Sequence, residues 1–286
     1  MRLDSRREVR ALLRQYGLRP KKSLGQNFLV NQAALQRIVE AAEVGATDLV
    51  VEVGPGLGCL TRQLAQRSKW VVAVELDQRL VEILEQVLAD YPNISIVHGD
   101  ILEIPPAELL MCIGRPDTPT TAPYKLVANL PYYITSAVLR HFLEADSKPS
   151  TMVVTVQREV AQRLTAKPGE MSLLAVSVQF YGRPRIVARL SAGAFYPSPQ
   201  VDSAVVRIDP YESPPMVVDD EEGFFAVVRA GFAQRRKQLR NALSQGLGLS
   251  TIQVVEALER AVVDPKCRAQ SLTLAEWGKV YQELKR

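Results

Sequence analysis

The sequence has 286 residues, enough for one large domain or for a large domain and a small one. Hydrophobic residues make up 47% and charged residues 23%, as in globular proteins, and no apolar run approaches the roughly 20 residues of a membrane span. Three widely spaced cysteines and two histidines argue against a disulfide framework, a metal site and a Ser-His-Asp hydrolase. The N-terminus contains no apolar signal segment, so we expect a cytoplasmic protein.

Positive charge is concentrated in two blocks, although the net charge is only +4. Residues 1–22 contain eight basic and two acidic side chains, and residues 224–243 contain five basic side chains and no acidic one. A solvated helix face would explain either block alone. Two blocks on one chain favour a polyanionic partner, nucleic acid first.

The N-terminal part predicts a basic helix over residues 5–16, followed by an irregular segment over residues 21–29. In that segment Gly25 permits close approach of a ligand, and two amides can bond a polar group. A plain linker is the alternative. The next predicted helix covers residues 32–42, with Asn31 as its cap.

A buried strand begins at residue 49 and runs into a glycine turn before a helix over residues 60–66. The turn contains Gly54, Gly56 and Gly58, which let a ligand lie close to the backbone at a helix N-terminus. A dinucleotide fingerprint needs its third glycine one position later, where this chain has Cys59. The spacing therefore favours a nucleoside-type cofactor over a pyrophosphate one.

Acidic side chains follow the next two predicted strands. The strand over residues 70–75 ends at Glu75, which lies 21 residues past Gly54. A separation of roughly 20 residues is expected between the glycine turn and a carboxylate that binds ribose hydroxyls. The strand over residues 94–97 leads to Asp100. Two acids at successive strand ends can hold a ribose and an adenine amino group.

A fourth predicted strand, residues 124–128, ends at Asn129-Leu130-Pro131-Tyr132. Ligands of open α/β sheets bind at the carboxyl ends of strands, so this tetrapeptide is a candidate site. A strand-terminating turn is the alternative, because Asn and Pro are common turn residues.

The remaining sequence predicts further alternation and then helices only. A strand is expected over residues 152–157, a closing strand pair over residues 186–190 and 201–208, and helices over residues 78–89, 136–143, 159–165, 172–181, 224–243, 254–261 and 274–284. Residues 105–123 are rich in Pro, Thr and Gly and are expected to form a surface loop. Two prolines stiffen the loop over residues 195–203, so an aromatic on it can be presented rigidly. An acidic linker over residues 212–222 places the domain boundary near Asp209.

Seven stretches in this order resemble the ribosomal RNA adenine dimethyltransferases that use S-adenosylmethionine, and among them the branch that acts on 16S rRNA. They are LGQNFL at 24–29, VEVGPGLG at 51–58, VELD at 74–77, GD at 99–100, ANLPYYIT at 128–135, FYPSPQVDSAVV at 195–206 and AGFAQRRKQLRNAL at 230–243. The resemblance covers nearly the whole chain. The glycine motif alone is weak evidence, whereas the combination is highly specific.

The resemblance implies an α/β fold, namely a Rossmann-like class I S-adenosylmethionine-dependent methyltransferase domain with a small all-helical C-terminal domain. We expect the first domain to cover residues 1–209, including the basic N-terminal extension, and the second to cover residues 210–286 and to dock RNA. The resemblance implies S-adenosyl-L-methionine as cofactor and assigns it Asn27, Leu29, Gly54, Gly56, Gly58, Glu75, Asp100 and Asn129.

The implied reaction is N6,N6-dimethylation of two adjacent adenosines in a hairpin near the 3′ end of 16S rRNA. The catalytic group would be Asn129, Leu130, Pro131, Tyr132 and Phe195, with the two aromatic rings on opposite faces of the base. Arg235, Arg236, Lys237 and Arg240 would bind RNA. The expected partner is 16S rRNA within the small ribosomal subunit or its precursor, and we expect a monomer without metal or membrane association.

Three alternatives stay open at this stage. A large-subunit (23S) rRNA adenine methyltransferase of the macrolide-resistance type shares the chemistry, but it more often carries Ile where this chain has Leu130. An adenine DNA methyltransferase typically has Pro-Pro before the aromatic residue. A non-enzymatic assembly or transcription factor on the same fold would be indicated by a degenerate cofactor site, whereas here every motif residue is present.

Overall fold

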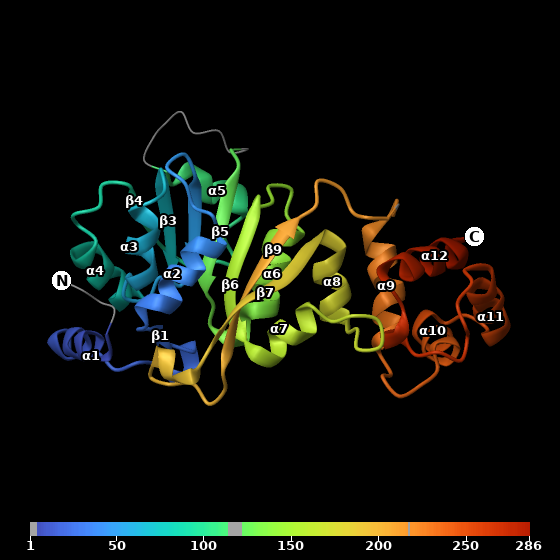
Figure 1. Ribbon diagram of the computed structural model, residues 1–286. Helices are drawn as coiled ribbons and strands as arrows, with labels where there is room; N and C mark the ends of the chain where they lie inside the picture. The colour runs from blue at the N-terminus through green and yellow to red at the C-terminus, as the bar shows by residue number, and fades with distance from the viewer. Residues whose placement is uncertain (1–4, 114–121, 217) are drawn as a thin grey trace. The chain divides into compact units, whose positions relative to one another are not determined.

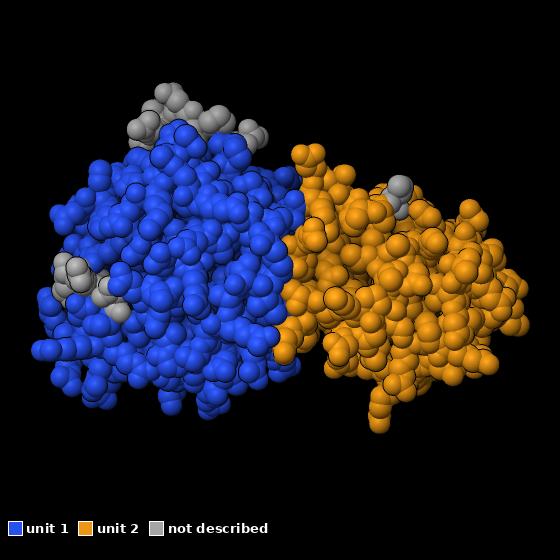
Figure 2. All heavy atoms as spheres, in the orientation of Figure 1, with its two compact units in different colours: residues 1–161, 185–210 blue, residues 162–184, 211–286 orange. Residues whose placement is uncertain are grey.

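The computed structural model describes residues 5–113, 122–216 and 218–286 (Figure 1). The chain divides into two compact units, shown in different colours in Figure 2. The first comprises residues 1–161 and 185–210, and the second comprises residues 162–184 and 211–286. The division joins residues 162–184 to the C-terminal helices in one unit.

A seven-stranded sheet forms the centre of the first unit, with the strand order β4-β3-β2-β5-β6-β9-β7. The strands are β2 (Leu49–Val53), β3 (Trp70–Glu75), β4 (Ile94–His98), β5 (Tyr124–Asn129), β6 (Thr151–Gln157), β7 (Gly182–Leu190) and β9 (Ser203–Pro210). Strands β2 to β6 pair in parallel, and β9 runs antiparallel to β6. The predicted strands are confirmed. The inner strands β2, β3, β5 and β6 are buried almost throughout, as expected for a parallel sheet covered on both faces, whereas the end strands β4 and β7 are largely half-buried or exposed.

Two apolar clusters account for the packing of the first four helices of the first unit. The helices are α1 (Arg6–Gln15), α2 (Gln32–Ala41), α3 (Cys59–Ala65), α4 (Gln78–Val87), α5 (Pro106–Met111), α6 (Thr135–Leu143) and, continuing past residue 161, α7 (Arg158–Leu164). One cluster joins α2 and α3 to the sheet, and the other joins α1 to α4. The predicted cap of α2 is confirmed, since Asn31 accepts a hydrogen bond from the Ala34 N–H at 2.9 Å.

A short two-stranded antiparallel sheet joins the N-terminal segment to the proline-rich loop. Strand β1 (Phe28–Leu29) pairs with β8 (Phe195–Tyr196), which aligns Leu29 with Phe195. This pairing links residues more than 160 positions apart and brings the segment after α1 to the end of the sheet where the site lies.

The second unit is helical and has its own aromatic core. Its helices are α8 (Leu173–Tyr181), α9 (Glu221–Phe232), α10 (Leu239–Leu247), α11 (Thr251–Arg260) and α12 (Leu274–Lys285). Phe180 of α8 stacks on Phe224 of α9 with ring centroids 5.0 Å apart, and Trp277 of α12 is fully buried. Among the residues described, no helix is long and apolar enough to cross a membrane.

Two predicted elements were wrong. Residues 106–111 form helix α5 instead of loop, with Leu109 and Leu110 buried, while residues 114–121 of the predicted loop lie outside the described residues. The helix predicted over residues 224–243 is two helices, α9 and α10. Helix α9 ends at Phe232 and α10 begins at Leu239, and the N–H groups of Leu239 and Arg240 in the first turn of α10 donate to the carbonyls of Cys267 and Pro265.

Candidate functional site

One cavity lies at the carboxyl ends of β2, β3 and β5 and collects most of the predicted site residues. Its lining includes the predicted cofactor residues Asn27, Leu29, Gly54, Gly56, Glu75, Asp100 and Asn129, and the predicted catalytic residues Leu130, Pro131, Tyr132 and Phe195. Strand β2 lies between β3 and β5. The chain fills the sheet on the β3 side of β2 first, with β3 and β4, and then crosses to the other side with β5 and β6. Such a switch point opens a crevice in which open α/β sheets bind ligands.

The glycine turn after β2 depends on backbone angles that favour glycine. Gly54, Gly56 and Gly58 have φ values of +67°, +60° and +80°. A Cβ on Gly56 would lie 3.0 Å from the Phe28 ring, so the turn also makes room for β1. Gly58 does not line the cavity; a Cβ there would lie 3.2 Å from Leu84 of α4, which indicates a packing role.

The two predicted acids occupy different environments. Glu75 is 7% exposed, and its carboxylate accepts hydrogen bonds from the N–H groups of Gly56 at 3.1 Å and Asp77 at 3.0 Å. Burial raises the pKa of Glu75, and these two backbone donors offset part of the rise. Asp100 is half-buried, and one of its oxygens accepts a hydrogen bond from the Leu102 N–H. Each side chain retains acceptor capacity for a polar ligand.

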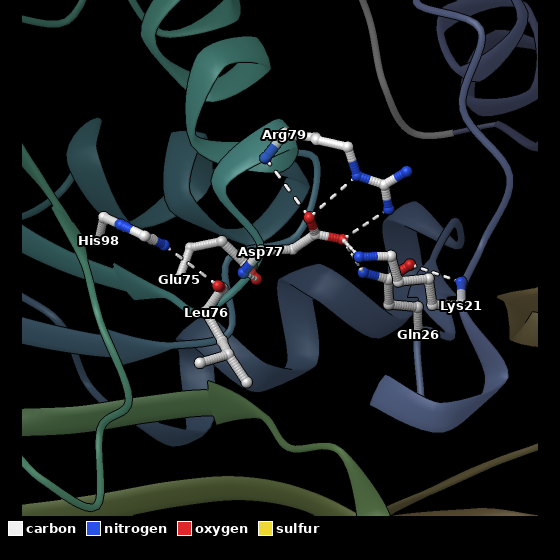
Figure 3. A network of polar contacts seen from close by, with 7 residues as sticks. All are labelled: Lys21, Gln26, Glu75, Leu76, Asp77, Arg79 and His98. Carbon is white, nitrogen blue, oxygen red and sulfur yellow. Dashed lines mark hydrogen bonds and ion pairs between the residues drawn. The ribbon is translucent and has the colours of Figure 1, made fainter.

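A polar network at Asp77 fastens the N-terminal segment beside Glu75 (Figure 3). The buried Asp77 carboxylate lies 2.9 Å from the Arg79 guanidinium and 3.3 Å from the Lys21 ammonium, and it accepts a hydrogen bond from Gln26 at 3.1 Å. The hydrogen bonds from Arg79 hold the pKa of Asp77 well below its usual range. The network therefore ties the segment that carries Asn27 to the turn after β3.

The tetrapeptide after β5 presents an amide and an aromatic ring to the cavity. The Asn129 amide nitrogen donates to the Asn27 carbonyl at 3.1 Å, which leaves its side-chain oxygen as an acceptor. The Tyr132 hydroxyl lies 2.7 Å from the Ser203 hydroxyl, so β9 fixes the orientation of this ring. Leu130, which precedes Pro131 in the tetrapeptide, is buried, with 2% of its surface exposed.

Phe195 lines the cavity from β8 and is buried, with only 1% of its surface exposed. The stiff loop that contains it is held by α1, because the Arg6 guanidinium donates to the carbonyl oxygens of Gly193 at 2.8 Å and Phe195 at 3.3 Å. The structure thus places the ring in the cavity wall, packed in the core cluster with Leu29, and not on an exposed loop.

Glu52 is a cavity residue that the sequence interpretation missed. It lies in β2 and is 1% exposed, and its Oε2 atom has no hydrogen-bond partner among the described residues. Burial raises the pKa of Glu52 to about 8; the Thr61 hydroxyl opposes this rise and the Glu75 carboxylate adds to it. One charged residue inside the apolar run LVVEV was a signal that could have identified it.

The predicted RNA-binding residues lie in the second unit, at the junction of α9 and α10. Arg235, Arg236 and Lys237 are exposed, and Lys237 donates a hydrogen bond to Gln245 at 2.9 Å. Arg240 differs, because it is half-buried in the first turn of α10 and its Nε has no partner among the described residues. Among all the residues that the structure describes, no three His, Cys, Asp or Glu side chains are grouped so that they could hold a metal ion.

The fold and the site together define the class of protein. A largely parallel sheet with an antiparallel strand beside β6, a glycine turn after β2 and acids after β3 and β4 is the arrangement of a class I S-adenosylmethionine-dependent methyltransferase. The family model described as ribosomal RNA adenine dimethylase matches residues 17–286. The chain therefore belongs to the ribosomal RNA adenine dimethylase family and is an rRNA methyltransferase.

Named relatives agree with this assignment. The chain is 50% identical over 270 residues to the ribosomal RNA small subunit methyltransferase A of Dehalococcoides mccartyi, covering 94% of this chain and 90% of the relative. It is 43% identical over 279 residues to the protein of that name from Moorella thermoacetica, covering 96% of each.

Solved structures share the fold. The crystal structure of the 23S rRNA methyltransferase ErmE has a TM-score of 0.71 and 29% identity, with 91% of this chain and 100% of that chain covered. A dimethyladenosine transferase from Plasmodium falciparum has a TM-score of 0.73, with 88% of this chain and 95% of that chain covered, and at 22% identity it supports the fold alone.

Proposed function

We propose that the protein transfers methyl groups from S-adenosyl-L-methionine to the exocyclic amines of two adjacent adenosines in a hairpin near the 3′ end of 16S rRNA. The product is N6,N6-dimethyladenosine in the small ribosomal subunit or its precursor, and the protein acts in ribosome biogenesis as a cytoplasmic monomer. The observation that carries the proposal is one cavity lined by both the glycine turn and Asn129-Leu130-Pro131-Tyr132.

The cavity has the features that the cofactor requires. The glycine turn brings backbone close to a ligand, and Glu75 offers a buried carboxylate suited to ribose hydroxyls. Asp100 lines the same cavity and would meet the adenine amino group, and Asn27, Leu29 and Asn129 are further lining residues. When bound, the cofactor supplies an electrophilic methyl group on a positively charged sulfur, so the protein needs no covalent nucleophile.

The protein's task is to orient a weakly nucleophilic amine. The lone pair of an adenine amine is delocalised into the ring, and hydrogen bonds from the amine to the Asn129 oxygen and the Leu130 carbonyl would favour a pyramidal nitrogen. Preorganised acceptors and in-line positioning are the means by which such a site lowers the barrier. Tyr132, fixed through Ser203, would stack on the extruded base, and Pro131 would hold the turn.

The small-subunit target is favoured over the 23S alternative. The two small-subunit methyltransferases described above are 50% and 43% identical to this chain, whereas ErmE is 29% identical. Leu130, the FYPSPQVDSAVV stretch and the C-terminal FAQRRKQLRNAL stretch support the same choice.

A labelling experiment tests the proposal. The protein is incubated with methyl-labelled S-adenosylmethionine and, separately, with unmodified small-subunit particles, large-subunit RNA and DNA. We expect dimethyladenosine only in the small-subunit particle. Label in large-subunit RNA would support the 23S alternative, and no transfer to any nucleic acid would support a non-enzymatic factor.

A further inference from the structure

Tyr133 is an exposed aromatic side chain at the rim of the cavity. It follows Tyr132 in the 3-10 turn Tyr132–Ile134, and both residues line the cavity. Their environments differ, since Tyr132 is half-buried and bonded to Ser203, whereas 59% of the Tyr133 surface is exposed. Within the described residues, no hydrogen bond involves the Tyr133 hydroxyl. The packing and polar contacts of the cavity therefore do not account for this ring.

The ring lies close to Gly25. A Cβ built on Gly25 would lie 3.4 Å from Cδ1 and 3.5 Å from Cε1 of Tyr133, so a side chain at this position would touch the ring that glycine leaves clear. Gly25 has a φ of +60° and ends the 3-10 turn Lys22–Leu24. The ring is thus bordered by this turn and otherwise exposed, and a tyrosine, with only two side-chain torsions, loses little conformational entropy when it stacks on a ligand.

Positive charge lies in the same turn. Lys21 and Lys22 are both exposed, and the Lys21 ammonium is paired with Asp77. Lys22 has no acidic partner among the described residues. Proteins bind single-stranded nucleic acid with aromatic rings on which bases stack and with basic side chains that neutralise phosphates. The turn that ends at Gly25, close to the Tyr133 ring, contains such a basic side chain in Lys22.

Base extrusion creates a need for such a surface. An adenine inside a helix or loop must leave its stack to reach the cavity, and its neighbour then has one face uncovered. We infer that Tyr133 stacks on the nucleotide adjacent to the extruded adenosine and makes the enzyme prefer a purine there. This inference rests on the proposed function. Since the two proposed targets are adjacent adenosines, each would present the other as a purine neighbour.

The cofactor is the competing ligand for this ring. Tyr133 lines the same cavity as Asp100 and Glu75, the acids proposed to bind the adenosine of the cofactor, and burial and then these carboxylates raise the pKa of Tyr133. A ring that contacted the cofactor would change its affinity, whereas a ring that stacks on RNA would not. The test therefore measures both ligands.

The experiment uses the full-length protein with Tyr133→Ala, Tyr133→Phe and the control Tyr211→Ala, which removes an exposed tyrosine outside the cavity lining. Substrates are unmodified small-subunit particles with a single target adenosine whose neighbour is guanosine, a purine that is not itself a target, or uridine. We expect Tyr133→Ala to lower kcat/KM on the guanosine-neighbour particle by about 5- to 150-fold, equivalent to roughly 1–3 kcal/mol. The loss should be smaller on the uridine-neighbour particle.

Tyr133→Phe keeps the stacking face and should retain activity within about twofold, as should Tyr211→Ala. The dissociation constant of S-adenosylmethionine should be unchanged in all three variants. An equal loss on both particles, no loss, or a weakened cofactor affinity would overturn the inference. Failure of the wild-type protein to methylate either particle would instead overturn the proposed function, so the two failures are distinguishable.

Discussion

Asn129 is the residue whose position in the structure bears most directly on the proposed reaction. Its side-chain nitrogen is committed to the Asn27 carbonyl, so the orientation of its oxygen is fixed before substrate binds. A preoriented acceptor of this kind costs no reorganisation during the reaction, which is why single polar groups in active sites have large effects on rate.

Replacing this residue gives the first prediction. Asn129→Ala should lower kcat for methyl transfer by about 100-fold or more, because the amine loses its side-chain acceptor. The affinity for S-adenosylmethionine should stay within a few-fold, since Gly54, Glu75 and Asp100 remain. Isothermal titration of the cofactor and single-turnover transfer to small-subunit particles measure the two effects separately. Normal turnover by this variant would contradict the assignment of the site.

Glu52 gives a second prediction, which concerns pH and stability. The pKa of Glu52 is raised from 4.5 to about 8, so the folded protein keeps a proton that the unfolded chain loses between these values. Stability therefore falls as pH rises through this window, by at most about 1.4 kcal/mol per pH unit. Glu52→Gln cannot titrate and should not share this loss.

Urea unfolding at pH 5.5, 6.5 and 7.5 checks the prediction, because Glu75 and the other titrating groups are common to both proteins. The free energy of unfolding of Glu52→Gln minus that of the wild-type protein should grow with each step in pH. A difference that is constant across the three pH values would show that Glu52 is already ionised in the folded protein.

At the level of elements, the N-terminal segment depends on Asp77 for its position over the cavity. In Figure 3 the Asp77 carboxylate faces Arg79 on one side and Lys21 and Gln26 on the other. Because its pKa is held below the usual range, Asp77 is fully ionised at neutral pH and above, and its contribution is lost only as pH falls through its folded pKa.

Asp77→Asn should loosen this segment without altering the tetrapeptide Asn129-Leu130-Pro131-Tyr132 that is proposed to be catalytic. We expect the dissociation constant of S-adenosylmethionine to rise about tenfold, because Asn27 is carried by the segment, while kcat at saturating cofactor stays within about twofold. Asp219→Asn is a matched control, since it removes the ion pair with Lys285 in the second unit. If kcat fell and the cofactor affinity did not, the segment would serve the RNA side of the site.

The elements also show what a sequence can predict. Strands β2, β3 and β5 were predicted because both faces of a parallel strand are buried and leave a continuous apolar run. The pairing of β1 with β8 was not, because two-residue strands have no period to detect. The break between α9 and α10 was missed because apolar residues stay near helical spacing across it, while the first N–H groups of α10 are satisfied by carbonyls of residues 265 and 267, which lie far along the chain.

Candidate site residues were predictable for a similar reason. Glycines and acids at strand ends follow fixed spacings, and Gly54, Gly56, Glu75 and Asp100 line one cavity, whereas Gly58 packs against α4. Glu52 was missed because it lies inside a strand, where the apolar neighbours made the whole segment look like an ordinary buried strand. Tyr133 was missed because only the fold distinguishes its exposed ring from the half-buried ring of Tyr132.

For the whole molecule, the two units divide the work that the proposed function requires. The first unit contains the complete cavity, and the second contains the basic block between α9 and α10. We propose that this block docks RNA through phosphate contacts. Phosphate contacts provide affinity that depends strongly on salt and carry little sequence information. Selection of the target adenosine would then fall to the first unit.

Neutralising the exposed basic residues tests this division. The triple variant Arg235→Gln, Arg236→Gln and Lys237→Gln should weaken RNA binding at low salt and reduce the slope of log K against log salt by about 2, at roughly 0.7 per phosphate contact with single-stranded RNA. Arg240 is kept, because its half-buried side chain would add a folding effect.

A second triple variant removes the same charge from the first unit, through Arg37→Gln, Arg67→Gln and Lys69→Gln, which are exposed and do not line the cavity. It should leave the slope nearly unchanged, because docking through specific contacts depends on where charge lies and not on its total. Both variants should bind S-adenosylmethionine normally. Equal slopes for the two triple variants would mean that the block at 235–237 is only a solvated surface, and that RNA is held by the first unit alone.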